Sequence, residues 1–355
     1  MQTEFLIIGQ GISGSWLSWF LEKEKRDFHV IDYPDTNTPS RLAAGIINPV
    51  TGRRHVETWM ADTLLPFAWE QYNEMGKFLG IEAISQKPIL DFFPSPQMRL
   101  SFLERVNEGA RFVSIPAEEN RFREFFNYEF GYGLIQPVYT AHLETLLPAW
   151  RKYLLEQERL SEESFDINYL ERSADNIIYK NISASFIIFC NGHEAALNPY
   201  FKNLPFAPNK GEALTLEIPD LPQTAIFKKG LSLVPLAQTG QWWIGSSYEW
   251  DFKHNDPTDA FRQRTEQLLQ QWLHIPFRVT NHVAGVRPAT LERRPFIGLH
   301  PHFQNIGILN GLGTKGCSLA PFFAKELIEE LIHQRPVHPE AAVSRYTKLL
   351  QRSQG

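Results

Sequence analysis

The stretch Phe5-Leu6-Ile7-Ile8-Gly9-Gln10-Gly11-Ile12-Ser13-Gly14 decides the fold of this 355-residue chain. A short apolar strand runs directly into three glycines with the spacing G-x-G-x-x-G, and apolar residues at helical spacing follow. Gly9 is expected to make the tight turn, Gly11 to let backbone N–H groups approach a pyrophosphate, and Gly14 to let the helix pack on the strand. The stretch therefore predicts a dinucleotide-binding unit, with phosphates at the N-terminus of the helix.

A second strand and an acidic residue follow at the distance that such a unit requires. Phe28-His29-Val30-Ile31 is typical of a buried strand, and Asp32 comes directly after it. An acidic residue about 20 residues beyond the glycines is the one that hydrogen-bonds a ribose 2′-hydroxyl. A glycine turn without a ligand would show the same glycine spacing, but it would not require this strand or Asp32.

Length and composition are typical of a globular protein with two domains. The 355 residues exceed a single typical core, 43% of them are hydrophobic and 21% are charged. The net charge of −5 provides no global attraction for nucleic acid or for an anionic membrane. Cys190 and Cys317 are too few for a disulfide framework, and neither lies in a metal-binding spacing. We expect no metal site.

The chain shows no signal for a membrane. No apolar run approaches the roughly 18 residues that span a bilayer. The glycine-rich stretch begins at Phe5, which leaves no room before it for a cleavable leader. We therefore expect a cytoplasmic protein without a membrane partner.

Glycines recur at the ends of strand-like segments throughout the chain, at positions 9–14, 45, 192, 285 and 311–316. One long cofactor contacted by several loop ends accounts for this better than unrelated turns do. FAD is such a cofactor, whereas NAD would need only the first cluster. The expected contacts are Gly9, Gly11, Ile12, Ser13, Gly14, Asp32, Tyr33, Ala43, Ala44, Gly45, Ile167, Asn191, Gly192, Arg287, Gly311, Leu312, Gly313, Thr314, Lys315 and Gly316.

The apolar patterns predict an α/β fold with two domains. Residues 186–189 are typical of a strand buried on both faces in a parallel sheet, and 213–218 and 241–245 of antiparallel strands. We expect a Rossmann-like FAD-binding domain, with a three-layer parallel sheet, and an inserted α+β substrate domain on a mainly antiparallel sheet. The predicted FAD-binding domain takes residues 1–50, 140–204 and 281–355, and the substrate domain takes 51–139 and 205–280.

Four motifs together resemble one family. They are the opening glycine stretch, Leu42-Ala43-Ala44-Gly45, the block from Gly285-Val286-Arg287-Pro288 to Pro295-Phe296-Ile297-Gly298, and Gly311-Leu312-Gly313-Thr314-Lys315-Gly316. In this order they cover nearly the whole chain and resemble the D-amino acid oxidase superfamily, which includes glycine and sarcosine oxidases. The last two are most similar to the flavin domain of the bacterial tRNA-modifying enzyme that acts on carboxymethylaminomethyl-uridine.

The resemblance implies oxidation of a C–N bond by hydride transfer to the flavin, in which positioning of the substrate dominates. Arg287 matches the position that holds a substrate carboxylate, and a guanidinium binds such an anion through two hydrogen bonds. Lys315 would lie close to the flavin, and Tyr248 would donate to the same carboxylate. Sarcosine oxidases tether flavin through a cysteine near the position of Gly285, so FAD is expected to be non-covalent here.

Each of these residues also has an ordinary structural interpretation. Arg287 would cap carbonyl groups or pair with Glu292, Lys315 would face solvent, and Tyr248 would be a sheet tyrosine. The adjacent Arg53 and Arg54 would line the entrance for an anionic substrate, or they would simply be solvated.

The sequence thus predicts a flavoenzyme that oxidises a small carboxylate-bearing amine, either an amino acid or an N-substituted glycine. Two alternatives stay open. One is a tRNA wobble carboxymethylaminomethyl-uridine oxidoreductase, which the net charge does not favour. The other is a non-catalytic flavin-binding protein. The electron acceptor is not readable from the sequence.

Overall fold

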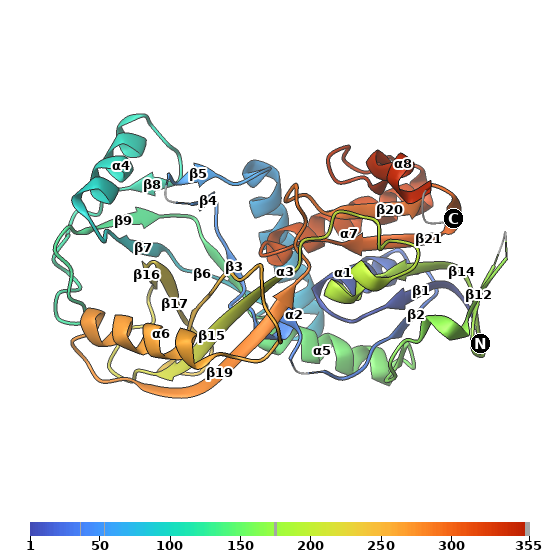
Figure 1. Cartoon of the computed structure of the whole chain (residues 1–355), viewed down its shortest axis with the longest axis horizontal. Coiled ribbons are helices and arrows are strands. Elements are labelled where there is room, and N and C mark those ends of the chain that lie inside the picture. The colour runs from blue at the N-terminus through green and yellow to red at the C-terminus, as the bar shows by residue number, and fades with distance from the viewer. Residues whose placement is uncertain (36, 53, 174–175, 352–355) are drawn as a thin grey trace.

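The computed structural model describes residues 1–35, 37–52, 54–173 and 176–351, and it divides into two parts that lie side by side along the long axis (Figure 1). The first strand, Gln2–Ile8, and the last described helix, Thr347–Leu350, lie in the part that contains the first sheet. At its centre are the parallel strands β2 (Phe28–Ile31), β1 (Gln2–Ile8), β14 (Ile182–Phe189) and β21 (Phe303–Asn310). These strands come from sequence-distant segments, as the recurring glycine-terminated strands predict.

Shorter strands extend this sheet on both sides. β11 (Leu160–Ser161) pairs in parallel with β2, and β20 (Phe296–His300) pairs antiparallel with β21. An antiparallel pair, β12 (Leu170–Arg172) and β13 (Ile177–Tyr179), extends the β14 side. The antiparallel strands therefore lie at the margins, while the centre is parallel.

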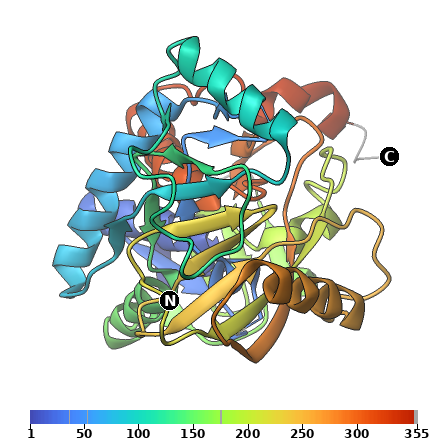
Figure 2. The same cartoon turned by 90° about the vertical axis from the view of Figure 1, so that its left-hand side faces the viewer.

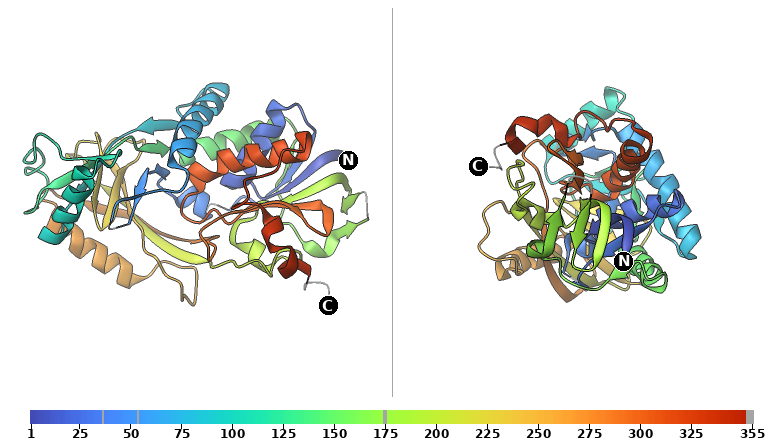
Figure 3. Two further views of the ribbon diagram at one scale, coloured as in Figure 1. Left: turned by 90° about the horizontal axis from the view of Figure 1, so that it is seen from above. Right: turned by 90° about the vertical axis from the view of Figure 1, so that its right-hand side faces the viewer.

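The first sheet is buried on both faces, because successive side chains of a strand point to opposite sides. Phe5 and Ile7 pack with one set of elements, whereas Leu6 and Ile8 pack with another. The first set comprises the helices α1 (Ile12–Lys23), α3 (Ala61–Leu79), α5 (Leu143–Glu156) and α7 (Gly316–His333), and Figure 3 shows them gathered on one side. The other face is covered by η2 (Gly192–Leu197), η3 (Val343–Tyr346) and α8 (Thr347–Leu350). The three-layer arrangement is confirmed.

The second sheet is almost entirely antiparallel, as predicted; only β16 and β7 run in parallel. Its strand order is β19 (Arg278–Arg287), β15 (Asn209–Glu217), β18 (Gln241–Gly245), β17 (Leu231–Pro235), β16 (Ile226–Lys229), β7 (Ile89–Phe92), β9 (Tyr132–Ile135) and β8 (Val113–Ser114). Viewed from this end, α4 (Pro96–Asn107) and α6 (Asp259–Trp272) lie on opposite sides of the strands (Figure 2). Leu269 and Trp272 of α6 and Phe102 of α4 belong to separate apolar clusters.

Short elements join the two parts. β10 (Tyr139–Ala141) pairs with β3 (Ile46–Ile47) and β6 (Ile84–Gln86), and β4 (Val50–Thr51) pairs with β5 (Val56–Glu57). The small helix α2 (Pro39–Leu42) contacts β19, and the Nε1–H of Trp243 donates to the Leu42 carbonyl at 3.0 Å. A fixed connection therefore runs from the first sheet to the second.

Two features differ from the sequence patterns. The predicted domain boundary at residue 281 falls inside β19, which pairs with β15 from Arg278 to Arg287. The sequence of about residues 82–139 is typical of short strands that alternate with polar turns, but this segment also contains helix α4. The Ser95 hydroxyl accepts the Met98 N–H at 3.3 Å, and Pro96 occupies the first turn, a combination typical of a helix start.

Candidate active site

One large cavity extends from the glycine-rich turn after β1 to the second sheet. Its volume is about 1620 Å³, larger than the roughly 300–1,000 Å³ of a pocket for a drug-sized ligand. Its walls include most of the predicted site residues, namely Gly9, Gly11, Ile12, Ser13, Asp32, Tyr33, Ala43, Ala44, Gly45, Asn191, Gly192, Tyr248, Arg287, Leu312, Gly313, Thr314, Lys315 and Gly316. The fold thus gathers these separate segments around one space.

The turn between β1 and α1 has the geometry that a pyrophosphate requires. Gly9 has a φ of +99°, and a Cβ at Gly14 would lie 1.8 Å from the Gly9 carbonyl oxygen. The first N–H groups of a helix have no partner within the helix, and Gly11, the N-cap residue of α1, has no side chain to supply one. Gly11 and Ser13 line the cavity at this helix end, so the residues present fit an anionic cofactor.

Asp32 follows β2 and is held on both oxygens. Its Oδ1 accepts the Gln10 N–H at 2.8 Å, and Arg151 Nη1 of α5 donates to Oδ2 at 2.6 Å. The carboxylate lines the cavity and keeps lone pairs for a ribose hydroxyl. Sequence reasoning missed Arg151; an arginine in the apolar stripe of a helix is the signal that was available.

The loop before β3 needs its glycine for a different reason than the one predicted. Gly45 has a φ of +74°, and a Cβ there would lie 1.9 Å from the Ala141 carbonyl oxygen. The close approach is therefore to strand β10, while Ala43 and Ala44 line the cavity. In the same region the Ser40 hydroxyl accepts the Ile12 N–H at 3.1 Å and so contacts the first turn of α1.

Lys315 lies in the last glycine-rich loop, at the N-cap of α7. It lines the cavity and is half-buried rather than fully exposed to solvent. Burial, helped by the positive charges of Arg294 and Arg293, lowers the pKa of its ammonium group to about 8. A lysine with such a pKa changes its charge just above neutral pH.

Arg287, at the end of β19, is held only by neutral groups. Its Nη1 donates to Asn209 Oδ1 at 2.7 Å and to the Ser247 carbonyl at 3.2 Å, and its Nη2 donates to Ser246 Oγ at 2.7 Å. Within the described part of the chain it has no carboxylate partner. Burial lowers the pKa of Arg287. Its ionised fork therefore faces the cavity without a counter-charge.

The alternative pairing of Arg287 with Glu292 is wrong. Glu292 lies 3.7 Å from Arg345 instead. Tyr248 is 60% exposed and lines the cavity. The centroid of its ring lies 4.8 Å from the guanidinium carbon of Arg287. Its ring thus contacts the predicted carboxylate-binding group.

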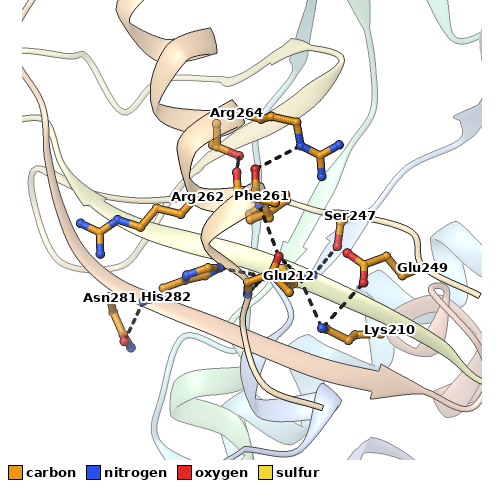
Figure 4. A network of polar contacts seen from close by, with 12 residues as sticks. Lys210, Glu212, Ser247, Glu249, Phe261, Arg262, Arg264, Asn281 and His282 are labelled. Carbon is orange, nitrogen blue, oxygen red and sulfur yellow. Dashed lines mark hydrogen bonds and ion pairs between the residues drawn. The ribbon is translucent and has the colours of Figure 1, made fainter. Parts of the chain in front are cut away.

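A buried polar network holds the segment 246–258 that carries Tyr248 (Figure 4). Glu212 is fully buried, and its main chain makes two hydrogen bonds with Ser247. The Glu212 carbonyl accepts the Ser247 N–H, and the Glu212 N–H donates to the Ser247 hydroxyl. At the other end of the segment, the Glu212 carboxylate accepts the Thr258 N–H at 2.6 Å and the Thr258 hydroxyl at 2.8 Å. One residue therefore anchors both ends.

The Glu212 carboxylate is balanced by two basic side chains. His282 Nε2 lies at 2.9 Å and Lys210 Nζ at 3.6 Å, and Lys210 also lies 3.7 Å from Glu249. Burial would raise the pKa of Glu212, but the hydrogen bonds from Thr258, the charge of Lys210 and the hydrogen bond with His282 lower it. The carboxylate is ionised. Ser247, which hydrogen-bonds to the main chain of Glu212, accepts a hydrogen bond from Arg287 through its own carbonyl group.

A second charged cluster lines the same cavity, on the face of the second sheet opposite to Glu212. Asp91 Oδ2 contacts His55 Nε2 at 2.8 Å and Lys228 Nζ at 2.6 Å. Sequence reasoning missed this cluster, because its members come from three distant segments. A charged residue inside the apolar strand Ile89–Phe92 is its one visible signal.

The remaining predicted residues lie elsewhere. Gly14 and Gly311 are packed behind the cavity wall, and Ile167 lies in η1 (Ile167–Tyr169) against the apolar cluster under the first sheet. Arg54 is exposed, and Arg53 lies outside the described residues. None of these lines the cavity where the structure describes them.

Both cysteines line the cavity as buried thiols. Burial raises the pKa of Cys317 to about 12 and also raises the pKa of Cys190. Across the described ranges no group of three histidine, cysteine or acidic side chains is placed to hold a metal ion. In the same ranges no helix is long and apolar enough to cross a membrane.

A family model described as "FAD dependent oxidoreductase" matches residues 4–330. Glycine oxidase from Bacillus subtilis (strain 168) is 23% identical over an alignment 372 positions long, which covers 95% of each chain.

Solved structures share the fold. Iminodiacetate oxidase from Chelativorans sp. BNC1 superposes with a TM-score of 0.74 at 17% identity, over 95% of this chain and 98% of that one. An L-amino acid deaminase from Proteus vulgaris reaches a TM-score of 0.77 at 14% identity, over 97% and 94%.

Proposed function

The chain belongs to the family of FAD-dependent oxidoreductases, and we propose that it oxidises the C–N bond of an amine that carries a carboxylate group, either an amino acid or an N-substituted glycine. The observation that carries the proposal is Arg287. A half-buried guanidinium that faces a cavity without a counter-charge offers a site for a planar anion, bound through two parallel hydrogen bonds.

The residues around the first sheet would hold FAD. The first turn of α1 would take the pyrophosphate and Asp32 a ribose hydroxyl, as the glycine geometry and the open lone pairs of the carboxylate allow. When bound, FAD supplies the hydride acceptor at its N5 position.

The chain's own contribution is positioning. Arg287 would hold the carboxylate, and Asn209 and Ser246 fix the orientation of its guanidinium. Held in this way, the carbon next to the amine would lie at a defined distance from the wall that carries Gly313 and Lys315. Loss of a hydride from that carbon leaves a C=N bond, which water then hydrolyses to a carbonyl compound and an amine. Holding one geometry accounts for most of the catalysis that such a reaction requires.

The relatives support this substrate class, since their names refer to glycine, iminodiacetate and L-amino acids. The net charge of −5 gives the tRNA alternative no support. The test is an anaerobic screen of amines, with glycine, sarcosine and longer N-substituted glycines, read as bleaching of the flavin absorbance. Bleaching by carboxylate-bearing amines and not by their decarboxylated analogues is expected. Bleaching by no amine would leave a non-catalytic flavin protein.

A further inference from the structure

We propose that the cavity contains a second polar subsite, formed by Asp91, Lys228 and His55, which binds an uncharged group that both donates and accepts hydrogen bonds, such as a primary amide, at the end of the substrate remote from its carboxylate. The proposal rests on the proposed function, because it defines the substrate class of the same cavity.

The three side chains form a built and largely buried site. The side chain of His55 is 2% exposed, that of Asp91 9% and that of Lys228 26%. All three line the cavity. Burial would raise the pKa of Asp91, but the contacts with His55 and Lys228 lower it, so the carboxylate is ionised at neutral pH. Its charge and that of Lys228 balance each other.

Hydrogen-bonding capacity is left over at this cluster. Both neighbours contact Oδ2 of Asp91, and across the described residues Oδ1 has no partner. Lys228 uses one of its three N–H donors. The Nδ1 atom of His55 is buried without a hydrogen-bond partner. The free acceptor, Asp91 Oδ1, and the free N–H donors of Lys228 together match a group such as a primary amide, which has both a donor and an acceptor.

A row of paired residues forms the floor of the cavity between this cluster and the Arg287 end. Pairing across the second sheet places Ala213, Gly245, Ser232, Lys228 and Asp91 opposite one another on successive strands. Paired residues share a face, and all five line the cavity. Between the charged ends this row carries Ala213, Gly245 and Ser232, and the ring of Trp243 lies over Gly245, where an added Cβ would be 2.6 Å from it.

The other face of the sheet is already occupied. The residues next to this row on their strands, Leu214, Leu233 and Phe227, point to the other face and pack with α6. On that same face Glu212 anchors the segment 246–258. The row of small residues therefore belongs to the cavity and not to a packed core.

The two ends are too far apart for a small substrate. The Arg287 guanidinium lies directly over Gly211, because a Cβ there would be 1.7 Å from Nη2. Gly211 is on β15 and Lys228 is on β16, three strand spacings away, which is roughly 14 Å. Glycine or sarcosine cannot reach both ends, so the subsite favours an amine with a long polar substituent.

The charges at this cluster also disfavour a substituent that ends in a charged group. A second carboxylate would meet Lys228 together with the ionised Asp91, and a second ammonium would meet Asp91 together with Lys228. A neutral group meets neither repulsion. The subsite therefore discriminates against dicarboxylate amines of the same length.

The test compares N-substituted glycines that end in a primary amide, a carboxylate or a methyl group, each with a linker of increasing length. The flavin-loaded enzyme should show a KM about tenfold lower for the amide than for the methyl compound, at the linker length that spans the floor. Equal KM values for the three end groups at every length would overturn the proposal.

Variants locate the effect. Lys228→Met and Ser232→Leu should each bring the ratio of methyl to amide KM close to one, the first by removing the donor and the second by filling the floor. Lys229→Met is the matched control, because Lys229 follows on the same strand but donates to the Asn127 carbonyl, and the ratio should persist. A ratio that survives in both Lys228→Met and Ser232→Leu would overturn the assignment.

The proposed function and the subsite fail in different ways. If no amine bleaches the flavin, the proposed function is wrong, and calorimetric titration of the same compounds still tests whether the amide binds more tightly. If sarcosine bleaches the flavin but the end group has no effect, only the subsite is wrong.

Discussion

The guanidinium carbon of Arg287 lies 4.8 Å from the centroid of the Tyr248 ring, so the cation rests on an aromatic face instead of against a carboxylate. Burial lowers the pKa of Arg287, while Tyr248 acts in the opposite direction. A cation–π contact supports a positive charge without neutralising it. The charge stays available to an anionic ligand.

Replacing Arg287 by lysine should raise the KM for carboxylate-bearing amines about 10- to 100-fold, because an ammonium cannot form the two parallel hydrogen bonds of the guanidinium. Flavin content should not change. Stopped-flow reduction of the flavin over a range of amine concentrations measures this effect. Arg278→Lys, at the other end of β19 and paired with Glu217, is the control and should behave like the wild type.

Replacing Tyr248 separates the ring from the hydroxyl. Tyr248→Phe keeps the aromatic face under Arg287 and should change the KM less than twofold, whereas Tyr248→Ala should raise it about two- to fivefold. Steady-state kinetics with one N-substituted glycine suffices. A large effect of Tyr248→Phe would show instead that the hydroxyl itself binds substrate.

Lys315 should make stability depend on pH between about 8 and 10.5. Burial lowers its pKa from 10.5 to about 8 in the folded protein, so over this interval the unfolded chain holds more protons and the contribution to stability rises with pH. Lys315→Met should therefore be more stable than the wild type at pH 7, with a difference that shrinks toward pH 10.5. Urea unfolding of the flavin-free protein measures it. In Lys315→Arg, which stays charged, the deficit relative to Lys315→Met should persist.

Glu212→Ala should lower the free energy of unfolding by about 3–5 kcal/mol, because it leaves Lys210 and His282 without their buried carboxylate. It should also increase cleavage by proteases within residues 246–258, since the Thr258 end of this segment loses its hydrogen bonds. Glu217→Ala, on the same strand, is the control, because Glu217 pairs with Arg278 at the surface. A Glu212→Ala protein with normal stability would refute the anchoring role.

Gly14→Ala should abolish flavin binding, because the new methyl group would lie 1.8 Å from the Gly9 carbonyl oxygen and force the turn open. The purified variant should be colourless. Gly109→Ala adds the same methyl group at a site with open space, where the φ of +76° strains only a turn remote from the Gly9–Gly14 stretch, and its preparation should stay yellow. A yellow Gly14→Ala protein would contradict the assigned packing of α1 on β1.

The sequence predicted most reliably what depends on neighbours along the chain. The turn at Gly9, the strand before Asp32 and the alternation in 213–218 are local patterns, and all are found in the structure. The resemblance supplied Arg287, but the absence of a carboxylate beside it required the structure.

Features that depend on distant pairing were not predictable. Asp91, His55 and Lys228 meet only because β7 pairs with β16 and the segment after β4 folds over both. Gly45 was interpreted from its position beside a cofactor loop, whereas its close neighbour, Ala141, lies almost 100 residues away. Patterns of single segments carry no information about such partners.

Helix α2 contacts the nucleotide-binding turn on one side, where Ser40 accepts the Ile12 N–H, and the second sheet on the other, where Leu42 accepts from Trp243. A ligand that binds only the ordered turn stabilises everything attached to it by mass action. We therefore propose that FAD binding at this turn and the attachment of the second sheet are thermodynamically linked. Loading with FAD should then make the second sheet more resistant to heat and to proteases.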